Sequence, residues 1–431
     1  MNMNSPRPNP YELDLETFNV ADPAIFQAGL EAPFFERLRD EAPVHYCPDS
    51  AFGPYWSITR YHDIMAVDKD HQRFSSAGGI TIGGAGGAPM PVQAQSEPES
   101  RDQVRKNWDG FGMFIAMDPP KHDVQRATVT GVVAPPNLAS LETVIRSRAA
   151  AILDALPLNE SFNWVDRVSI ELTTQMLATL FDFPFEDRRK LTRWSDVATT
   201  PPGMGVSETP EARRAELLEC LAYFTQLWNE RAKARPSNDL ISMLAHGEST
   251  KHMAPLEFLG NLLLLIVGGN DTTRNSISGG VLAMNEYPGE LDKIKADPRL
   301  IPNMVSEVIR WQTPLAHMRR TTTVDVELNG QSIRAGEKVV MWYLSGNRDP
   351  RAIAQADAFR VDRSKARQHL SFGYGIHRCM GNRLAEMQLR VLWEEILKRF
   401  EFIEVVSPPE RTYSTFIRGF KSLEVTLHPR Q

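Results

Sequence analysis

The sequence of 431 residues predicts a mainly α-helical protein that also contains small β-sheets. Apolar residues recur with helical period over most of three long stretches: 138–245, 255–287 and 384–400. Short alternating patterns, which are typical of strands, lie at 43–61, 314–350 and 401–429. Pro157, Pro184 and the segment 200–203 interrupt the first helical stretch, so several helices are expected there.

Composition excludes several classes of protein. With 42% hydrophobic and 24% charged residues, the chain has an ordinary globular composition. The net charge of −6 gives no electrostatic reason to bind nucleic acid. The three cysteines, Cys47, Cys220 and Cys379, are too few for a disulfide framework, which fits a reducing cytoplasm.

Neither a signal peptide nor a membrane anchor is expected. The N-terminus is polar and proline-rich, and the longest strongly apolar run, 262–267, is far shorter than a membrane span. Residues 1–30 are predicted to form a loosely ordered arm. Because the rest contains no repeat and no long low-complexity linker, residues 31–431 are predicted to form a single domain, and we expect a cytoplasmic monomer.

The chemistry centres on residues 372–381, FGYGIHRCMG, which precede an amphipathic helix. A cysteine at the mouth of a helix faces unpaired N–H groups and the positive end of the helix dipole, and both favour its thiolate form. The surrounding glycines let the backbone and the Cys379 sulfur approach something flat and bulky. A thiolate held in this way suits a soft metal such as haem iron, although a lone cysteine is most often a small buried hydrophobe.

The spacing Phe-x-x-Gly-x-His-x-Cys-x-Gly decides between these interpretations. At roughly one residue type in twenty per position, chance gives about three matches in ten million starting positions. The segment resembles the haem-ligand loop of the cytochrome P-450 superfamily. The resemblance implies the fold of that family, an α-rich bundle around haem b with a small β-rich region. It also makes Cys379 the axial iron ligand and places Phe372 and His377 beside the haem.

Residues 117–126, MDPPKHDVQR, predict a helix capped by Asp118. His122 and Arg126 fall at i and i+4 on one face of this helix, where two surface charges are the simplest interpretation. A haem carries two propionates, and such a pair can clamp a carboxylate. The pair resembles the His-x-x-x-Arg of the family, which implies that both residues bind propionates.

The helix predicted over 255–287 has an unusual centre. Gly268 and Gly269 each weaken a helix by roughly 1 kcal/mol relative to alanine. An acid and two hydroxyls follow in an otherwise buried helix, and such local conflicts tend to mark function, although a capped helix break on a surface is the alternative. A threonine hydroxyl can bond the carbonyl one turn back and open a gap. The segment resembles the Gly-Gly-x-Asp-Thr-Thr of the family, which implies that Asp271 and Thr272 relay protons.

Two further landmarks follow in the order that the family shows. Glu307 and Arg310 match its Glu-x-x-Arg pair, and Arg363 takes the place of the arginine that interlocks with them, although Val361 stands where the family usually has proline. Arg319 and Arg320 face opposite ways on an extended strand. In the pattern of the family, the position counted back from Asp325 is Arg320, so the resemblance implies that Arg320 is a propionate partner, and Arg319 remains an equal alternative.

Together the landmarks predict a haem-thiolate monooxygenase that inserts one atom of dioxygen into a hydrophobic small molecule. No Gly-x-Gly-x-x-Gly follows a predicted strand, so electrons are expected from a 2Fe–2S ferredoxin with its NAD(P)H-dependent reductase. A basic surface could dock this acidic partner, or could simply be solvated: Lys365, Arg367, Arg378 and Arg383. The alternatives are a peroxide-driven enzyme, a non-enzymatic haem sensor and a haem-free cysteine site.

The substrate is predicted from resemblance to the bacterial branch that hydroxylates the terminal carbon of medium-chain alkanes and fatty acids. A hydroxylase of another hydrophobic substrate, such as a terpene, steroid or polyketide, is the alternative. The Gly- and Pro-rich residues 75–98 are expected to form a lid over the pocket or a surface loop. An apolar wall is expected from six residues: Leu264, Val267, Gly268, Leu315, Met318 and Phe416.

Overall fold

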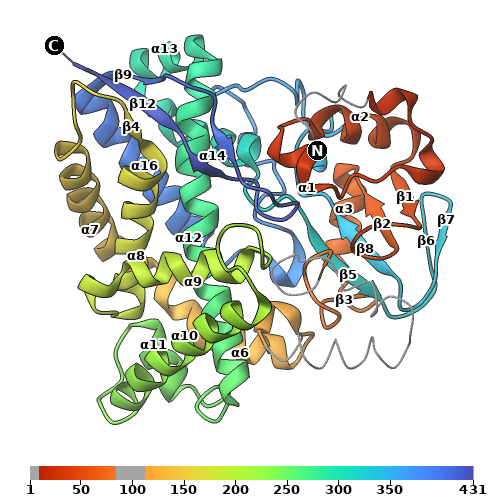
Figure 1. The fold of residues 1–431 in the computed structure, drawn as a ribbon, viewed down its shortest axis with the longest axis horizontal. Helices are drawn as coiled ribbons and strands as arrows, with labels where there is room; N and C mark the ends of the chain where they lie inside the picture. The colour runs from red at the N-terminus through yellow and green to blue at the C-terminus, as the bar shows by residue number, and fades with distance from the viewer. Residues whose placement is uncertain (1–8, 84–111, 431) are drawn as a thin grey trace.

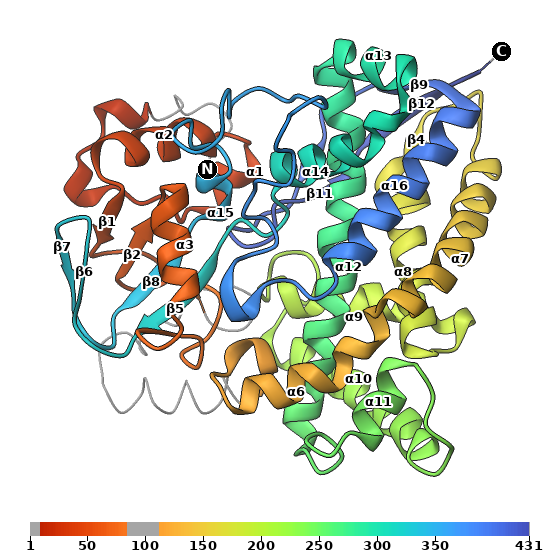
Figure 2. The same ribbon diagram turned by 180° about the vertical axis from the view of Figure 1, so that it is seen from behind.

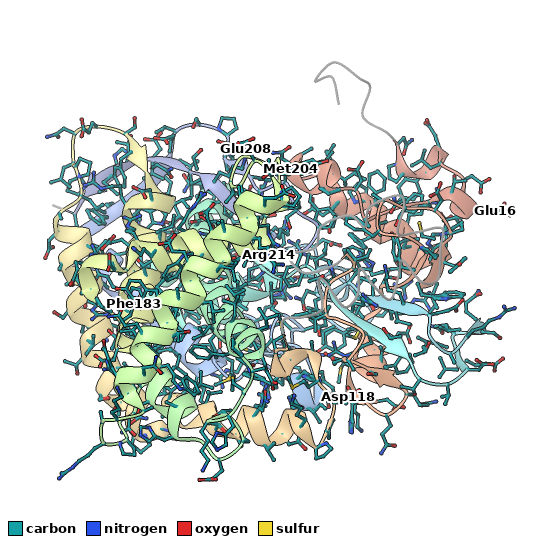
Figure 3. All side chains as sticks on the ribbon, turned by 60° about the horizontal axis from the view of Figure 1, so that its bottom comes forward. Glu16, Asp118, Phe183, Met204, Glu208 and Arg214 are labelled. Atoms are coloured by element: carbon teal, nitrogen blue, oxygen red, sulfur yellow. The ribbon has the colours of Figure 1, made fainter. Side chains whose placement is uncertain are left out.

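Helix α12, Pro255–Glu286, runs through the helical part of the molecule from one end to the other, and a smaller sheet-rich part lies to one side of it (Figures 1 and 2). The structure is a computed structural model that describes residues 9–83 and 112–430. In Figure 3, Phe183 lies in the helical part, Glu16 lies at the outer edge of the sheet-rich part, and Asp118 lies between them.

The helical part is built from amphipathic helices that bury their apolar faces in one large core. Its helices around α12 are α6 Lys121–Thr130, α7 Pro135–Asp154, α8 Glu171–Phe181, α9 Arg189–Thr199, α10 Pro210–Arg231, α11 Leu240–His246, α13 Pro288–Ala296, α14 Ile301–Gln312 and α16 Asn382–Arg399. The breaks predicted at Pro157, Pro184 and 200–203 all fall between helices.

The sheet-rich part holds a five-stranded sheet of order β1-β2-β8-β5-β3, in which β2 and β8 are parallel and the other neighbours antiparallel. Its strands are β1 Val44–Cys47, β2 Tyr55–Ile58, β3 Phe74–Ser75, β5 Met318–Thr322 and β8 Lys338–Met341. Three short helices accompany the sheet: α2 Glu31–Glu41, α3 Tyr61–Lys69 and α15 Tyr343–Gly346.

Three small sheets complete the fold. A hairpin joins β6 Val326–Leu328 to β7 Gln331–Ile333, and its turn uses Asn329 and Gly330 at positive φ, as the sequence predicted. The others are β4-β12-β9 and β10-β11, from the strands β4 Phe162–Asn163, β9 Phe400–Val405, β10 Glu410–Arg411, β11 Phe420–Ser422 and β12 Glu424–Pro429.

The N-terminal segment differs from the prediction of a loosely ordered arm. From residue 9 onward it forms two short 3-10 helices and α1, Pro23–Gln27, whose N-terminus Asp22 caps. Phe18 and Phe26 are buried, and Phe26 stacks on Trp342 with ring centroids 6.0 Å apart. The prediction was wrong here because these elements are shorter than the window in which helical periodicity can be seen.

Helix α12 begins and ends where the sequence indicated. Pro255 occupies its first turn, where the missing N–H costs nothing. Pro288, which directly follows Tyr287, starts the next helix and prevents α12 from continuing. Its 32 residues span about 48 Å at 1.5 Å per residue, so one face passes the site and the other packs in the core.

A buried ion network ties α14 to the loop that follows α15. Both side chains of the Glu307–Arg310 pair are fully buried, and two N–H···O bonds of 2.7 Å join them. Arg363 donates from Nε to both Glu307 oxygens at 2.9 Å. Arg310 also donates to the carbonyls of Asn347 and Ala356. Burial raises the pKa of Glu307, but the two arginines outweigh burial and hold that pKa below its ordinary value.

Replacing Glu307 by Gln should lower the free energy of unfolding by about 3–5 kcal/mol, because two buried guanidiniums would lose their counter-charge. Since the pKa of Glu307 is lowered in the folded state, this contribution is present above its ordinary pKa of 4.5 and is lost as the pH falls. Urea unfolding at neutral and acidic pH measures both effects. The exposed Glu404, paired with His428, provides the control variant Glu404→Gln. An equal, small loss in the two variants would contradict the account.

Candidate active site

The cysteine loop and the centre of α12 face one cavity of about 390 Å³. Cys379 and Thr272 both line it, and so does every residue predicted for the apolar wall: Leu264, Val267, Gly268, Leu315, Met318 and Phe416. Of the predicted haem contacts, four line it as well: Arg126, Arg320, Phe372 and His377. Segments more than a hundred residues apart in the sequence therefore converge on one place, although their roles stay predictions.

The loop before Cys379 is folded tightly by its own backbone. The Cys379 N–H donates to the Phe372 carbonyl at 2.8 Å, and Gly373 and Gly375 have φ of 67° and 73°. A Cβ on Gly375 would lie 2.5 Å from the Asp68 carbonyl oxygen, so only glycine fits there. Helix α16 begins three residues after the cysteine, at Asn382, which is the helix mouth that the sequence indicated.

Asp68 of α3 is a residue that the sequence did not bring to attention. Its carboxylate accepts hydrogen bonds from the Tyr374 N–H at 2.8 Å, the Tyr343 hydroxyl at 2.7 Å and Arg320 at 2.6 Å. It thereby joins the cysteine loop, α15 and β5, and it is almost fully buried. Nothing in the pattern around position 68 distinguishes this aspartate from an ordinary helix residue.

Two opposing effects act on the thiol of Cys379. Cys379 is exposed to the cavity, but the protein around it raises the pKa of its thiol, while the N–H groups of Gly381 and Asn382 and the guanidiniums of Arg126 and Arg378 lower that pKa. The net direction is upward, so the N-terminus of α16 alone does not favour the thiolate that the sequence indicated. A bound metal ion would add the missing positive charge and deprotonate the thiol.

Buried polar atoms beside the loop fit a carboxylate-bearing cofactor. His122 is buried, its Nδ1 lies 2.7 Å from Asp123, and its Nε2 has no hydrogen-bond partner in the described part of the chain. Neither ring nitrogen of His377 has a hydrogen-bond partner among the described residues. The centroids of the His122 and His377 rings lie 4.3 Å apart. Orphaned buried donors of this kind need a partner, and haem propionates would supply one. Among the described residues, no three His, Cys, Asp or Glu side chains gather into a metal cage.

Arg319 and Arg320 both line the cavity, so the structure keeps both as candidates for the propionates. They alternate along β5 as expected, with Arg320 buried and Arg319 half-buried. Arg320 is held by its ion pair with Asp68. Arg126 lies on α6 and donates through Nη2 to the Arg378 carbonyl of the cysteine loop. These guanidiniums therefore reach the cavity from two separate elements.

The predicted cap on α6 is wrong. Asp118 accepts hydrogen bonds from the Ser75 hydroxyl and, at 3.0 Å, from the Ser76 N–H, and α6 begins at Lys121 without a side-chain cap. Asp118 instead holds Ser75 and Ser76, the first two residues of the segment that was predicted to form a lid. Residues 84–98 of that lid lie outside the described residues, so its covering role stays a prediction.

The centre of α12 separates its acid from its hydroxyl. Thr272 lines the cavity, and its Oγ1 donates to the Gly268 carbonyl at 2.8 Å, as expected. Asp271 is fully buried and does not line the cavity. Its Oδ1 lies 2.9 Å from Arg274. Burial raises the pKa of Asp271 to about 6, with the Arg274 guanidinium opposing the rise.

Helices α8–α10, in which the sequence indicated no chemistry, supply much of the remaining wall. Leu177, Leu180, Thr199 and Leu217 line the cavity. Arg213 also lines it, from a helix face that is otherwise apolar. Arg213 stands among apolar residues on the buried face of α10, and this pattern in the sequence could have indicated a functional residue, because a guanidinium is rarely buried.

The α-rich fold, the cysteine loop and the glycine-weakened helix together define a haem-thiolate protein. The chain belongs to the cytochrome P450 family, and the cofactor of that family is haem b with thiolate-ligated iron. The Cytochrome P450 family model matches residues 214–427. No helix in the described part of the chain is long and apolar enough to span a membrane.

Relatives and solved structures agree with this assignment. Linalool 8-monooxygenase of Pseudomonas putida is 34% identical, over 96% of this chain and 100% of the relative. A methyl-branched lipid omega-hydroxylase of Mycobacterium bovis is 31% identical, over 91% of this chain and 90% of the relative. The structure of cytochrome P450-153 from Novosphingobium aromaticivorans is 45% identical, with a TM-score of 0.85 over 96% of this chain and 100% of that one.

If Arg126 binds a propionate, Arg126→Leu should speed haem loss about 10- to 100-fold, because a hydrogen bond to a charged group is worth about 1.5–3 kcal/mol. Transfer of haem to an excess of a tight haem acceptor, followed in the Soret band, measures the rate. Arg367→Leu is the matched control, because Arg367 is exposed, pairs with Glu386 and does not line the cavity. Equal rates in the two variants would contradict the assignment.

Proposed function

We propose that this monooxygenase hydroxylates the terminal carbon of medium-chain n-alkanes or fatty acids. The observation that carries the proposal is the apolar wall that leads to Thr272. The same cavity is lined by Leu264 and Val267 of α12, by Leu315, by Met318 of β5, and by Phe416. An unfunctionalised chain is recognised by shape and by burial of its methylenes, at about 0.8 kcal/mol each.

Terminal attack places a particular demand on this cavity. The primary C–H bond is the least reactive one in the chain, so only geometry can select it. A channel that is narrow where it passes Thr272 would present the chain end first. Side chains from α8, α10 and α12 meet around the cavity and would confine the chain there: Leu177, Leu180, Leu217, Leu263 and Leu264.

The relatives support the proposal and also supply the second candidate. One relative is named an omega-hydroxylase of methyl-branched lipids, which is attack at the end of an apolar chain. Another is named linalool 8-monooxygenase, so an acyclic terpene alcohol is the alternative substrate. Both substrates are flexible and largely apolar, and both suit the same kind of wall.

In the proposed mechanism, the haem, when bound through Cys379, supplies the iron centre at which dioxygen is split and one oxygen atom is inserted into a C–H bond. His122, Arg126, His377 and either Arg319 or Arg320 would hold its propionates. The apolar wall orients the substrate and excludes water. Thr272 and Asp271 would supply the protons, because the second oxygen atom leaves as water.

Electrons would come from a 2Fe–2S ferredoxin and its reductase, in the cytoplasm. Four exposed basic residues lie in or near the cysteine loop: Lys365 and Arg367 precede it, Arg378 lies within it, and Arg383 follows it. A basic surface next to the metal ligand would steer an acidic electron carrier toward the shortest path to the iron.

With a ferredoxin, its reductase and NADH, octane and dodecanoic acid should give mainly the terminal alcohol. Leu264→Ala should lower the ratio of terminal to subterminal product about tenfold, because one missing side chain lets the chain slide past the reacting position. Gas chromatography of the products measures the ratio. Leu256→Ala is the control, because Leu256 is exposed on the same helix. Only subterminal products from the wild type, or conversion of linalool alone, would overturn the substrate assignment.

A further inference from the structure

A second cavity, of about 400 Å³, lies apart from the candidate active site. It is lined by residues of α2, of the C-terminal part of α12, of the end of α14 and of the segment from β10 to β11. It therefore lies where the sheet-rich part meets the helical part (Figures 1 and 2). Within the described ranges, 9–83 and 112–430, the two cavities share no lining residue. The proposed function gives this second cavity no role.

Guanidiniums from four places in the chain line the second cavity: Arg39 of α2, Arg348 after α15, Arg411 of β10 and Arg418 between β10 and β11. Arg39 is buried, and Arg348 lies over the ring of Trp311, 3.3 Å from its centroid. The planar fork of a guanidinium can donate two parallel hydrogen bonds to a carboxylate. Four such groups around one cavity therefore favour an anionic ligand.

Positive charge exceeds negative charge in the interior of the second cavity. Glu31 is the one buried acid among the described residues that line it. Three other acids of the wall are exposed, and solvent screens their charges: Glu36, Glu286 and Asp357. Burial and then neighbouring arginines lower the pKa of Arg348 and of Arg411, and Arg418 is one of these neighbours in both cases. A bound anion would balance this charge.

Arg411 has hydrogen-bonding capacity that the protein leaves unused. Its guanidinium lies 5.2 Å from the centroid of the Phe420 ring, and no residue in the described part of the chain accepts a hydrogen bond from it. Arg348 donates once among these residues, from Nη2 to the Trp311 carbonyl at 3.2 Å. Each guanidinium carries five N–H donors. Both side chains therefore have donors left for a ligand or for water.

The carboxylate of Glu31 adds a different requirement, for a hydrogen-bond donor. Its Oε1 accepts a hydrogen bond from Arg418 Nε at 2.8 Å. Its Oε2 is buried and has no partner among the described residues, although buried acceptors normally have one. Since Glu31 lies beside Arg418, a ligand whose carboxylate binds Arg418 could reach Oε2 with a hydroxyl on a nearby carbon.

The rest of the wall includes apolar side chains from three helices: Phe35 of α2, Leu282 and Ala283 of α12, and Leu344 of α15. They would bury the hydrocarbon part of a ligand. A water molecule occupies about 30 Å³ of liquid, so a small inorganic anion would fill only a minor part of this volume. The wall thus fits a ligand with one polar end and an apolar body.

We propose that the second cavity binds a small aliphatic hydroxy acid. Its carboxylate lies between the guanidiniums of Arg411 and Arg418, and its hydroxyl, on C2 or C3, donates to Oε2 of Glu31. Its hydrocarbon part packs on Phe35 and Leu282. None of these side chains lines the cavity that holds Cys379, so the inference does not rest on the proposed function.

Calorimetric titration of the holoenzyme with 3-hydroxyhexanoate tests the proposal, without a reductase so that no turnover occurs. Hexanoate, which lacks the hydroxyl, should bind about tenfold more weakly, because one hydrogen bond to a charged group is lost. Hexane-1,3-diol, which lacks the carboxylate, should bind at least about a hundredfold more weakly. A ligand that binds only the folded protein also raises the midpoint of thermal unfolding, which gives a second measure of the same order.

Arg411→Gln should weaken binding of 3-hydroxyhexanoate about 10- to 100-fold. The substitution removes no hydrogen bond within the described part of the chain, so the variant should fold. Arg411→Lys should recover only part of the loss, because an ammonium keeps the charge without the planar fork. The matched control is Arg299→Gln, since Arg299 is exposed, pairs with Asp297 and does not line the second cavity. The reduced carbon monoxide spectrum and the thermal midpoint without ligand check that the variants fold.

A crystal grown with 6-bromo-3-hydroxyhexanoate locates the ligand in the wild type and does not depend on any variant. The anomalous signal of bromine should lie beside Phe35 and Leu282. A signal found only in the cavity of Cys379 would overturn the proposal.

Three results of the titrations would also overturn it. The first is no binding of 3-hydroxyhexanoate, or equal binding in Arg411→Gln and Arg299→Gln. The second is hexanoate that binds as tightly as 3-hydroxyhexanoate, because Glu31 would then not recognise a hydroxyl. The third is inorganic phosphate that binds as tightly, because the apolar wall would then contribute nothing.

Discussion

The buried Glu307–Arg310–Arg363 network is the constraint on which the site depends. Arg310 donates to the Asn347 carbonyl, and the Asn347 amide donates to the Ser371 hydroxyl at 2.9 Å. Ser371 directly precedes Phe372, whose carbonyl accepts the Cys379 N–H. Hydrogen bonds and one peptide bond thus connect α14 to Cys379, the proposed metal ligand. A thiolate must meet a flat cofactor at a fixed place, and a loop can provide that only if buried groups hold it.

Helix α12 forms the side of the cavity opposite the cysteine loop. It is a long helix that is weakened at its centre by two glycines. Successive residues of a helix point about 100° apart, so Thr272 can face the cavity while Asp271 faces α9. The hydroxyl thereby lies among the apolar side chains that line the cavity, and the carboxyl lies beside Arg274 and Asp196, whose charges shift its pKa in opposite directions. Gly268 leaves open space where a Cβ would stand, and Gly269 permits close contact with Leu177. Function here uses both faces of one helix.

The sequence predicted the helix bounds and the convergence of Cys379, Thr272 and the apolar wall, because motifs with fixed spacing and long periodic segments are local signals. It did not predict Asp68, because the hydrogen-bond partners of this residue lie on other elements and the sequence around position 68 gives no sign of them. It was wrong to expect a loosely ordered arm from residue 9 onward, since the 3-10 helices and α1 there are too short to show a helical period. The thiol pKa also could not be predicted, because the protein around the thiol, not the N-terminus of α16, dominates it.

The central claim is that Cys379 holds haem iron as a thiolate in the cavity it shares with Thr272. The absorption spectrum of the reduced protein under carbon monoxide tests it most directly. The account predicts the red-shifted Soret band of thiolate ligation in the wild type, and its loss in Cys379→Ala but not in Cys220→Ala. A wild type without that shift, or a Cys379→Ala variant that keeps it, would contradict the account.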